Sequence, residues 1–203
     1  MVYLYRSYEH YLLEMSFIEW FHSRSCGQFF AHVDPEFIVE ASKDQEICKH
    51  IDKIEESLKI VLSTDFNPET TDKELVHQAT DLYGLAHKKY LTTEEGQKQM
   101  IEKKEKSLFP RCPRLLCHGE VCLPCGICDE IGKEKMKLFC PNCTDIYEYD
   151  GLCSKDIDGA YFGKKWIHII IDKYPSLTPE NPPEEFIPQV YGFQVYLPES
   201  SPK

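Results

Sequence analysis

Two stretches in the first half of the chain carry apolar residues at helical spacing. In residues 44–62 they recur at steps of three and four, which places them on one face of a helix. They are Ile47, Ile51, Ile54, Leu58 and Val61. A capping-box pattern, Thr71 with Glu74, begins a second helix. Its expected buried stripe is Leu75, Ala79, Leu82, Ala86 and Tyr90. Residues 63–68 combine side chains that hydrogen-bond locally with a proline, both of which end helices, so the two helices are predicted to fold back on each other.

Shorter helical signals lie on either side of this pair. Asp34 followed by Pro35 is typical of the start of a helix. A third helix begins after Thr92 and Thr93 and carries the alternating charge run 102–106, for which the pattern favours a solvent-exposed face. Residues 1–107 are therefore predicted to form an all-helical domain.

Beyond residue 107 the apolar runs shorten to strand length, and Cys, Gly and Pro become frequent. The runs 135–139 and 166–171 are predicted strands, so we expect a compact antiparallel β domain over residues 108–174. Prolines at 175, 179, 182, 183 and 188 favour extended backbone, which predicts a proline-rich linker and an extended C-terminal tail over residues 175–203. The predicted fold class is α+β.

Charge and composition narrow the classes of function. The 203 residues are 42% hydrophobic, enough for a buried core, and the formal net charge is -11. Nucleic-acid binding draws its affinity from Lys and Arg that neutralise phosphates, so this charge argues against nucleic acid as the main partner. No run of 18 apolar residues exists, and residues 1–8 are polar too early for a signal peptide. We expect a protein of the cytoplasm and nucleus with no membrane partner.

Ten cysteines point to a metal site, because clustered thiols in a reducing compartment are more often ligands than disulfides. Eight of them fall between residues 112 and 153. Two close pairs, Cys112 with Cys117 and Cys140 with Cys143, are separated by 22 residues. Zinc prefers four such ligands in a tetrahedron. The spacing predicts one structural zinc ion per chain in a zinc-ribbon domain.

The remaining cysteines leave alternatives open. Cys122, Cys125 and Cys128 could hold a second metal, together with Cys153. An iron–sulfur cluster fits poorly, because eleven residues separate Cys128 from Cys140 where a ferredoxin has three. Residues 125–128 also match the C-x-x-C of a thiol oxidoreductase, but without its strand-to-helix context. Residues 118–120 resemble a deaminase fragment, but the Pro-Cys-x-x-Cys at 124–128 follows too closely for a deaminase. Cys26 and Cys48 are expected to fill the core.

Motifs along most of the chain resemble the regulatory beta subunit of protein kinase casein kinase II. They are residues 20–21 (WF), 28–34 (QFFAHVD), 37–38 (FI), 82–87 (LYGLAH), 90–92 (YLT), 112–114 (CPR), 138–143 (LFCPNC), 158–163 (DGAYFG) and 188–193 (PQVYGF). The resemblance spans about residues 16–197 and includes the cysteine spacings of four, 22 and two. Cys122, Cys125 and Cys128 have no counterpart in the family pattern.

The resemblance implies a non-catalytic regulatory subunit of a Ser/Thr protein kinase. In the family the zinc ribbon forms a homodimer, two catalytic subunits attach, and the assembly is stabilised and directed to its protein substrates. The C-terminal segment docks the catalytic subunit, and the matching positions here are Tyr191, Phe193 and Ile169. An extended tail would place Tyr191, Phe193, Val195 and Leu197 on one face, as docking requires.

The rival interpretation is a zinc-ribbon transcription factor that binds nucleic acid. Its support is a set of cations around the first cysteine pair: Lys103, Lys104, Lys106, Arg111 and Arg114. In an acidic chain this basic footprint is small, and the family resemblance favours the regulatory subunit.

Overall fold

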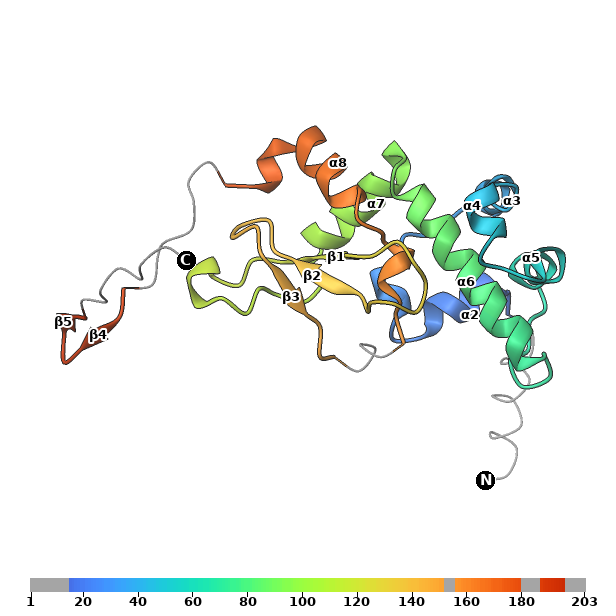
Figure 1. Cartoon of the computed structure of the whole chain (residues 1–203), viewed down its shortest axis with the longest axis horizontal. Coiled ribbons are helices and arrows are strands. Elements are labelled where there is room, and N and C mark those ends of the chain that lie inside the picture. The colour runs from blue at the N-terminus through green and yellow to red at the C-terminus, as the bar shows by residue number, and fades with distance from the viewer. Residues whose placement is uncertain (1–14, 152–155, 180–186, 196–203) are drawn as a thin grey trace, which may run out of the picture.

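The computed structural model describes residues 15–151, 156–179 and 187–195. Its helices are α2 (Phe17–Ser23), α3 (Pro35–Ala41), α4 (Gln45–Cys48), α5 (Ile54–Val61), α6 (Lys73–Tyr90), α7 (Glu94–Glu105) and α8 (Trp166–Lys173). Its strands are β1 (Leu123–Cys125), β2 (Lys137–Phe139), β3 (Ile146–Glu148), β4 (Gln189–Val190) and β5 (Phe193–Gln194). Figure 1 shows α2 to α6 on one side of the β1–β3 sheet and the β4–β5 hairpin standing apart from the rest. The predicted α+β class is confirmed.

Aromatic side chains fill the core between the helices. The ring of Phe21 lies 4.8 Å from that of Phe30 and 4.6 Å from that of Tyr83, between centroids. Phe17 meets Phe66 edge to face at 5.1 Å. Helix α6 runs through this core and is buried on several faces; its buried residues are Gln78, Ala79, Asp81, Leu82, Tyr83, Gly84, Leu85, Ala86, His87 and Tyr90. Aromatic packing around α6 therefore organises the N-terminal half.

The single helix expected over residues 44–62 is wrong, because it is divided into α4 and α5. Residues 49–53 form turns between them, and the backbone N–H of Lys53 donates to the side-chain oxygen of Gln78 on α6, at 2.9 Å. This hydrogen bond to Gln78 takes the place of the one that the Lys53 N–H would make within a continuous helix. The apolar face survives the interruption: Ile47, Ile51 and Val61 are buried.

The helix starts follow their local signals, with one shift of position. Pro35 occupies the first turn of α3, and the Thr93 side chain caps α7 by accepting from the Gly96 N–H. The N-cap of α6 is Asp72, not the expected Thr71, because the Asp72 carboxylate accepts from the Leu75 N–H at 3.1 Å. Both residue types favour N-caps, so the sequence alone left this register open.

The ribbon sheet is antiparallel in the order β1-β2-β3. Leu138, at its centre, lies opposite Pro124 on one side and Tyr147 on the other. The strand expected over residues 135–139 is present but begins at Lys137. Each strand has only three residues, so the sheet alone buries little apolar surface.

The strand expected over residues 166–171 is wrong, because these residues form helix α8. The run is rich in β-branched isoleucine, and its single polar residue, His168, is too little to reveal a helical period. In the structure Trp166, Ile167 and Ile170 form a buried stripe at helical spacing. Packing of that stripe decides the conformation against the β propensity of the residues.

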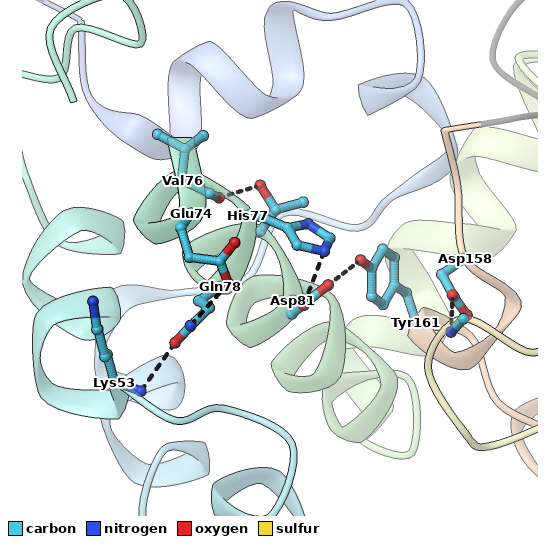
Figure 2. Close-up of polar contacts among 10 residues, drawn as sticks. Lys53, Glu74, Val76, His77, Gln78, Asp81, Asp158 and Tyr161 are labelled. Carbon is cyan, nitrogen blue, oxygen red and sulfur yellow. Dashed lines mark hydrogen bonds and ion pairs between the residues drawn. The ribbon is translucent and has the colours of Figure 1, made fainter. Parts of the chain in front are cut away.

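A 3₁₀ turn, η3 (Gly159–Tyr161), inserts a side chain of the C-terminal half against α6. Figure 2 shows the Tyr161 hydroxyl directed at Asp81, to which it donates a hydrogen bond of 2.6 Å. The ring lies over Gly84, where a Cβ would come within 2.2 Å of it. His87 Nδ1 donates to the Tyr161 carbonyl at 2.9 Å, and the Ala31 N–H donates to Nε2 at 3.0 Å. The helices and the ribbon therefore share one interior.

No helix in the described part of the chain is both long and apolar enough to cross a membrane. The division of the chain into domains with boundaries at residues 107 and 174 stays a prediction.

Candidate metal centre

Two tight turns present the four cysteines that the sequence singles out. In the first turn, the N–H of Cys112 donates to the carbonyl of Glu120 at 2.7 Å, and η2 (Leu115–Cys117) ends at the left-handed residue His118. In the second turn, the N–H of Thr144 donates back to the Cys140 carbonyl at 2.8 Å, and Thr144 is also left-handed. Each turn therefore directs two thiols toward the same point.

The sulfur positions match a tetrahedral zinc centre. All four sulfurs lie within 4.8 Å of one another. Cys112 Sγ is 3.9 Å from Cys143 Sγ, and Cys140 Sγ is 4.0 Å from Cys117 Sγ. Four sulfurs at about 2.3 Å from a tetrahedral zinc lie about 3.8 Å from each other, whereas a disulfide joins sulfurs at about 2.0 Å. The arrangement fits Zn²⁺, and the four thiols would be its complete ligand set.

All four thiols are buried. Burial raises the pKa of Cys117 to about 11 and also raises that of Cys140. Although burial opposes ionisation of Cys143 as well, the Tyr147 hydroxyl at 3.1 Å lowers its pKa to about 7. Zinc binds thiolates and displaces their protons, and Cys143 ionises more readily than Cys117 or Cys140. No sequence signal pointed to Tyr147, which reaches the site because β3 turns back along β2.

Cys122, Cys125 and Cys128, the other described cysteines of the cluster, do not form a second metal site among themselves. Among the described residues the four thiols above are the only group of His, Cys, Asp or Glu side chains placed to share an ion. Cys122 and Cys125 are buried in and beside β1, and Cys128 is half-buried. Cys153 lies outside the described residues. The prediction that Cys26 fills the core is confirmed by its burial, whereas Cys48 is exposed.

The enzymatic alternatives lose their physical support. A reactive thiol needs a lowered pKa, but burial raises the pKa of Cys125 to about 12. Cys125 also ends a strand and does not begin a helix. His118 stands in a turn at a left-handed position, whereas the deaminase fragment requires its His and Glu on a helix.

The five cations that supported nucleic-acid binding all have partners within the protein. Lys103 donates to the Phe30 and Gln28 carbonyls at 2.5 and 3.1 Å. Lys104 pairs with Glu120 at 2.6 Å. The other three contacts are Lys106 with Glu102, Arg111 with the Gly119 carbonyl and Arg114 with Asp145. The charge run 102–106 is thus only partly exposed, because Lys103 and Lys104 reach across to neighbouring segments.

The expected docking residues lie in two different settings. Tyr191 and Phe193 are 98% and 79% exposed at the tip of the β4–β5 hairpin. The extended tail that we expected is wrong here, because Tyr191 and Gly192 both adopt positive φ and form a tight two-residue turn. The signal for it was the glycine at the second turn position. Ile169 is half-buried on α8, and Leu197 lies outside the described residues.

The fold and the site define an α+β protein whose small β-sheet carries a four-cysteine metal centre. The family described as casein kinase II regulatory subunit matches residues 16–194, so the chain belongs to this family. It is 35% identical over 186 residues to casein kinase II subunit beta of Dictyostelium discoideum, an alignment of 90% of this chain and 69% of that protein. Identity to casein kinase II subunit beta of Schizosaccharomyces pombe is 35% over 182 residues, which cover 88% of this chain and 78% of that protein. Identity to casein kinase II subunit beta' of Drosophila melanogaster is 31% over 188 residues, which cover 90% of this chain and 85% of that protein.

Family membership makes a kinase catalytic subunit the expected partner of this chain. It also separates the two rival interpretations, because a regulatory kinase subunit needs no basic surface around its cysteines.

Proposed function

We propose that this chain is the non-catalytic regulatory subunit of a casein kinase II-type Ser/Thr kinase. In this proposal it binds zinc, forms a homodimer, holds two catalytic subunits, stabilises the holoenzyme and helps select its protein substrates. The observation that supports it most is the tetrahedral spacing of four buried thiols inside a chain that the family matches over residues 16–194.

Zinc gives the ribbon the rigidity that a dimer interface needs. Structural zinc contributes roughly 10–16 kcal/mol of apparent binding free energy, as much as a whole small domain. The ribbon also exposes apolar side chains: Leu115 in the first cysteine turn is 83% exposed and Ile146 on β3 is 51% exposed. Covering such residues is favourable, so this face supports pairing with a second copy of the chain.

The β4–β5 hairpin is the proposed docking element for the catalytic subunit. Tyr191 and Phe193 make large apolar surfaces available at one tip, and a tight turn holds them there with little ordering cost. Aromatic side chains of this kind are typical interface hot spots, where truncation to alanine costs about 2 kcal/mol or more. Ile169, half-buried on α8, is proposed as a third contact.

The test is capture of a casein kinase II catalytic subunit by the tagged full chain. The double variant Tyr191→Ala with Phe193→Ala is expected to weaken binding at least thirtyfold, in line with a loss of about 2 kcal/mol or more. Gln189→Ala, exposed on the same hairpin, is the matched control and should bind like the parent. Zinc content and the unfolding midpoint should stay at parental values in both.

Three outcomes would contradict the proposal. They are failure of the parent to capture the kinase, full affinity in the double variant, and a monomeric zinc-loaded parent by native mass measurement. Weaker capture of the kinase by Ile169→Ala alone would show that Ile169 contributes a contact of its own, separate from the hairpin.

A further inference from the structure

The Tyr147 side chain reaches the metal centre from β3, outside the two cysteine turns. Its hydroxyl oxygen lies 3.1 Å from Cys143 Sγ. The Cys112 thiol is a second hydrogen-bond partner of the same hydroxyl. Cys112 belongs to the first turn and Cys143 to the second, 31 residues later, and their sulfurs lie 3.9 Å apart. One hydroxyl group therefore contacts ligands from both turns.

The register of β3 decides which side chain faces the thiols. The Cys140 N–H donates to the Asp145 carbonyl at 3.0 Å and closes the turn that leads into β3. Tyr147 then lies opposite Leu138 in the sheet. Neighbouring strand residues point to opposite faces, and accordingly Ile146 is 51% exposed while Tyr147 is half-buried. A slip of one residue would turn Tyr147 away from the thiols.

The tyrosine ring is held in place by its surroundings. It packs against the buried core that the helices and the ribbon share. A tyrosine has only two rotatable side-chain bonds, so little conformational freedom is lost when its hydroxyl is fixed beside the sulfurs. Tyr147 thus presents a donor to the metal centre at a small ordering cost.

The direction of the hydrogen bond depends on whether the sulfur carries a proton. Between the hydroxyl and the Cys143 thiol, either group can donate. A zinc ligand is a thiolate, which has no proton and only accepts, so the hydroxyl is then the donor. Hydrogen bonds to an ionised acceptor are about twice as strong as those between neutral groups. The contact of Tyr147 with Cys143 is therefore stronger when the sulfur is a metal ligand.

Other donors near the thiols do not connect the two turns. The N–H of Asp145 hydrogen-bonds the Cys143 sulfur, and the N–H of Cys143 hydrogen-bonds the Cys140 sulfur. Both of these donors lie within the second turn. Cys122 contacts Cys140 through its thiol, but a thiol is a weak donor. Among these donors, Tyr147 alone contacts ligands of both turns.

We propose that Tyr147 is a positioning residue of the metal centre, whose hydroxyl joins the two cysteine turns and slows the release of zinc. This inference rests on the zinc binding of the proposed function and deepens it. Removal of the hydroxyl leaves all four thiols in place. The expected consequence is therefore weaker binding and faster release of the ion, not loss of the site.

The test compares Tyr147→Phe with the parent as zinc-loaded full chains. Loss of a hydrogen bond to a metal ligand typically weakens metal binding about 10–100-fold. The affinity for zinc, measured by competition with a chromophoric chelator, should fall by that factor in the variant, and zinc release should be faster. Tyr174→Phe removes the hydroxyl of another half-buried tyrosine, outside the metal centre, and should behave like the parent. Circular dichroism of both variants checks the fold.

A second readout separates a direct contact from a general loosening of the ribbon. With Co²⁺ in place of Zn²⁺, the sulfur-to-cobalt charge-transfer band reports the energy of the sulfur lone pairs. A hydrogen-bond donor lowers that energy, so Tyr147→Phe should shift the band to longer wavelength, while the bands of tetrahedral cobalt stay in place. Tyr174→Phe should leave all bands unchanged.

The proposal is overturned if Tyr147→Phe binds and releases zinc like the parent. It is equally overturned if weaker binding leaves the charge-transfer band in place, or if Tyr174→Phe shows the same changes. A parent that binds no zinc would overturn the proposed function as well, whereas a zinc-binding parent with an unaffected variant would overturn only the role of Tyr147.

Discussion

The helices and the zinc ribbon reach stability by different physical means. Around α6 the core consists of large aromatic and aliphatic side chains that pack ring against ring, as Phe21 does with Tyr83 and Phe30. The ribbon has three strands of three residues, and six cysteines are among its buried residues. In the proposed function, hydrophobic burial is sufficient for the first region, whereas the second is cross-linked by the metal. Tyr161 joins the two regions.

Metal removal should produce the largest difference in stability between the helices and the ribbon. A zinc contribution of roughly 10–16 kcal/mol exceeds what nine strand residues can replace, so the ribbon should open when the ion is chelated. In a hydrogen-exchange experiment with excess chelator, amides of β2 should lose protection while those of α6 keep most of theirs. Equal loss in β2 and α6 would mean that the regions form one cooperative unit, and unchanged protection in β2 would refute the metal requirement.

Truncation in the aromatic core should have the next largest effect. Phe17 is fully buried, so Phe17→Ala is expected to lower the free energy of unfolding by about 3–5 kcal/mol. Urea unfolding measures this change, and bound zinc should stay at the parental amount because the four thiols are untouched. Leu108→Ala, at a 45% exposed position, is the control and should cost little. Loss of zinc in Phe17→Ala would show that the core holds the ribbon together.

A methyl group added at Gly84 should crowd the contact between the helices and the ribbon. A Cβ there would lie 2.2 Å from the Tyr161 ring, so Gly84→Ala is expected to destabilise by about 1–3 kcal/mol. In a Tyr161→Ala background the added methyl has room, and the same substitution should then cost much less. A thermal unfolding cycle over the four proteins measures the coupling. Additive effects would show that the ring and Gly84 do not constrain each other.

The smallest expected effect is a pH dependence at the same contact. Burial raises the pKa of Asp81 above its ordinary value of 3.8, although the Tyr161 hydrogen bond opposes the shift. The folded state thus holds this proton more tightly than the unfolded state. Asp81 therefore contributes most below pH 3.8, and its contribution falls as pH rises through the raised pKa. Asp81→Asn should remove that fall.

This difference is measured by urea unfolding of parent and Asp81→Asn across the acidic range. Protonation of the zinc thiolates affects both proteins alike and cancels in the comparison. A constant difference at all pH values would contradict the raised pKa.

Much of the fold could be predicted because its signals are local. The four cysteines needed only their spacing, and the apolar face of Ile47, Ile51 and Val61 needed only its period. Two wrong predictions have tertiary causes. The bond from Lys53 to Gln78 divides a helix, and burial of Trp166 and Ile170 turns a β-prone run into α8. The contact of Tyr147 with Cys143 spans only four residues, but it depends on the turn between β2 and β3, which no sequence pattern announced.

Metal binding by the full chain, measured with Co²⁺ in place of Zn²⁺, tests the four-cysteine centre most directly. We expect one ion per chain and the absorption of a tetrahedral thiolate site. This signal should disappear in Cys140→Ser and persist in Cys122→Ala. Retention of the same site in Cys140→Ser, or its loss in Cys122→Ala, would contradict the assignment of Cys112, Cys117, Cys140 and Cys143 as the four ligands.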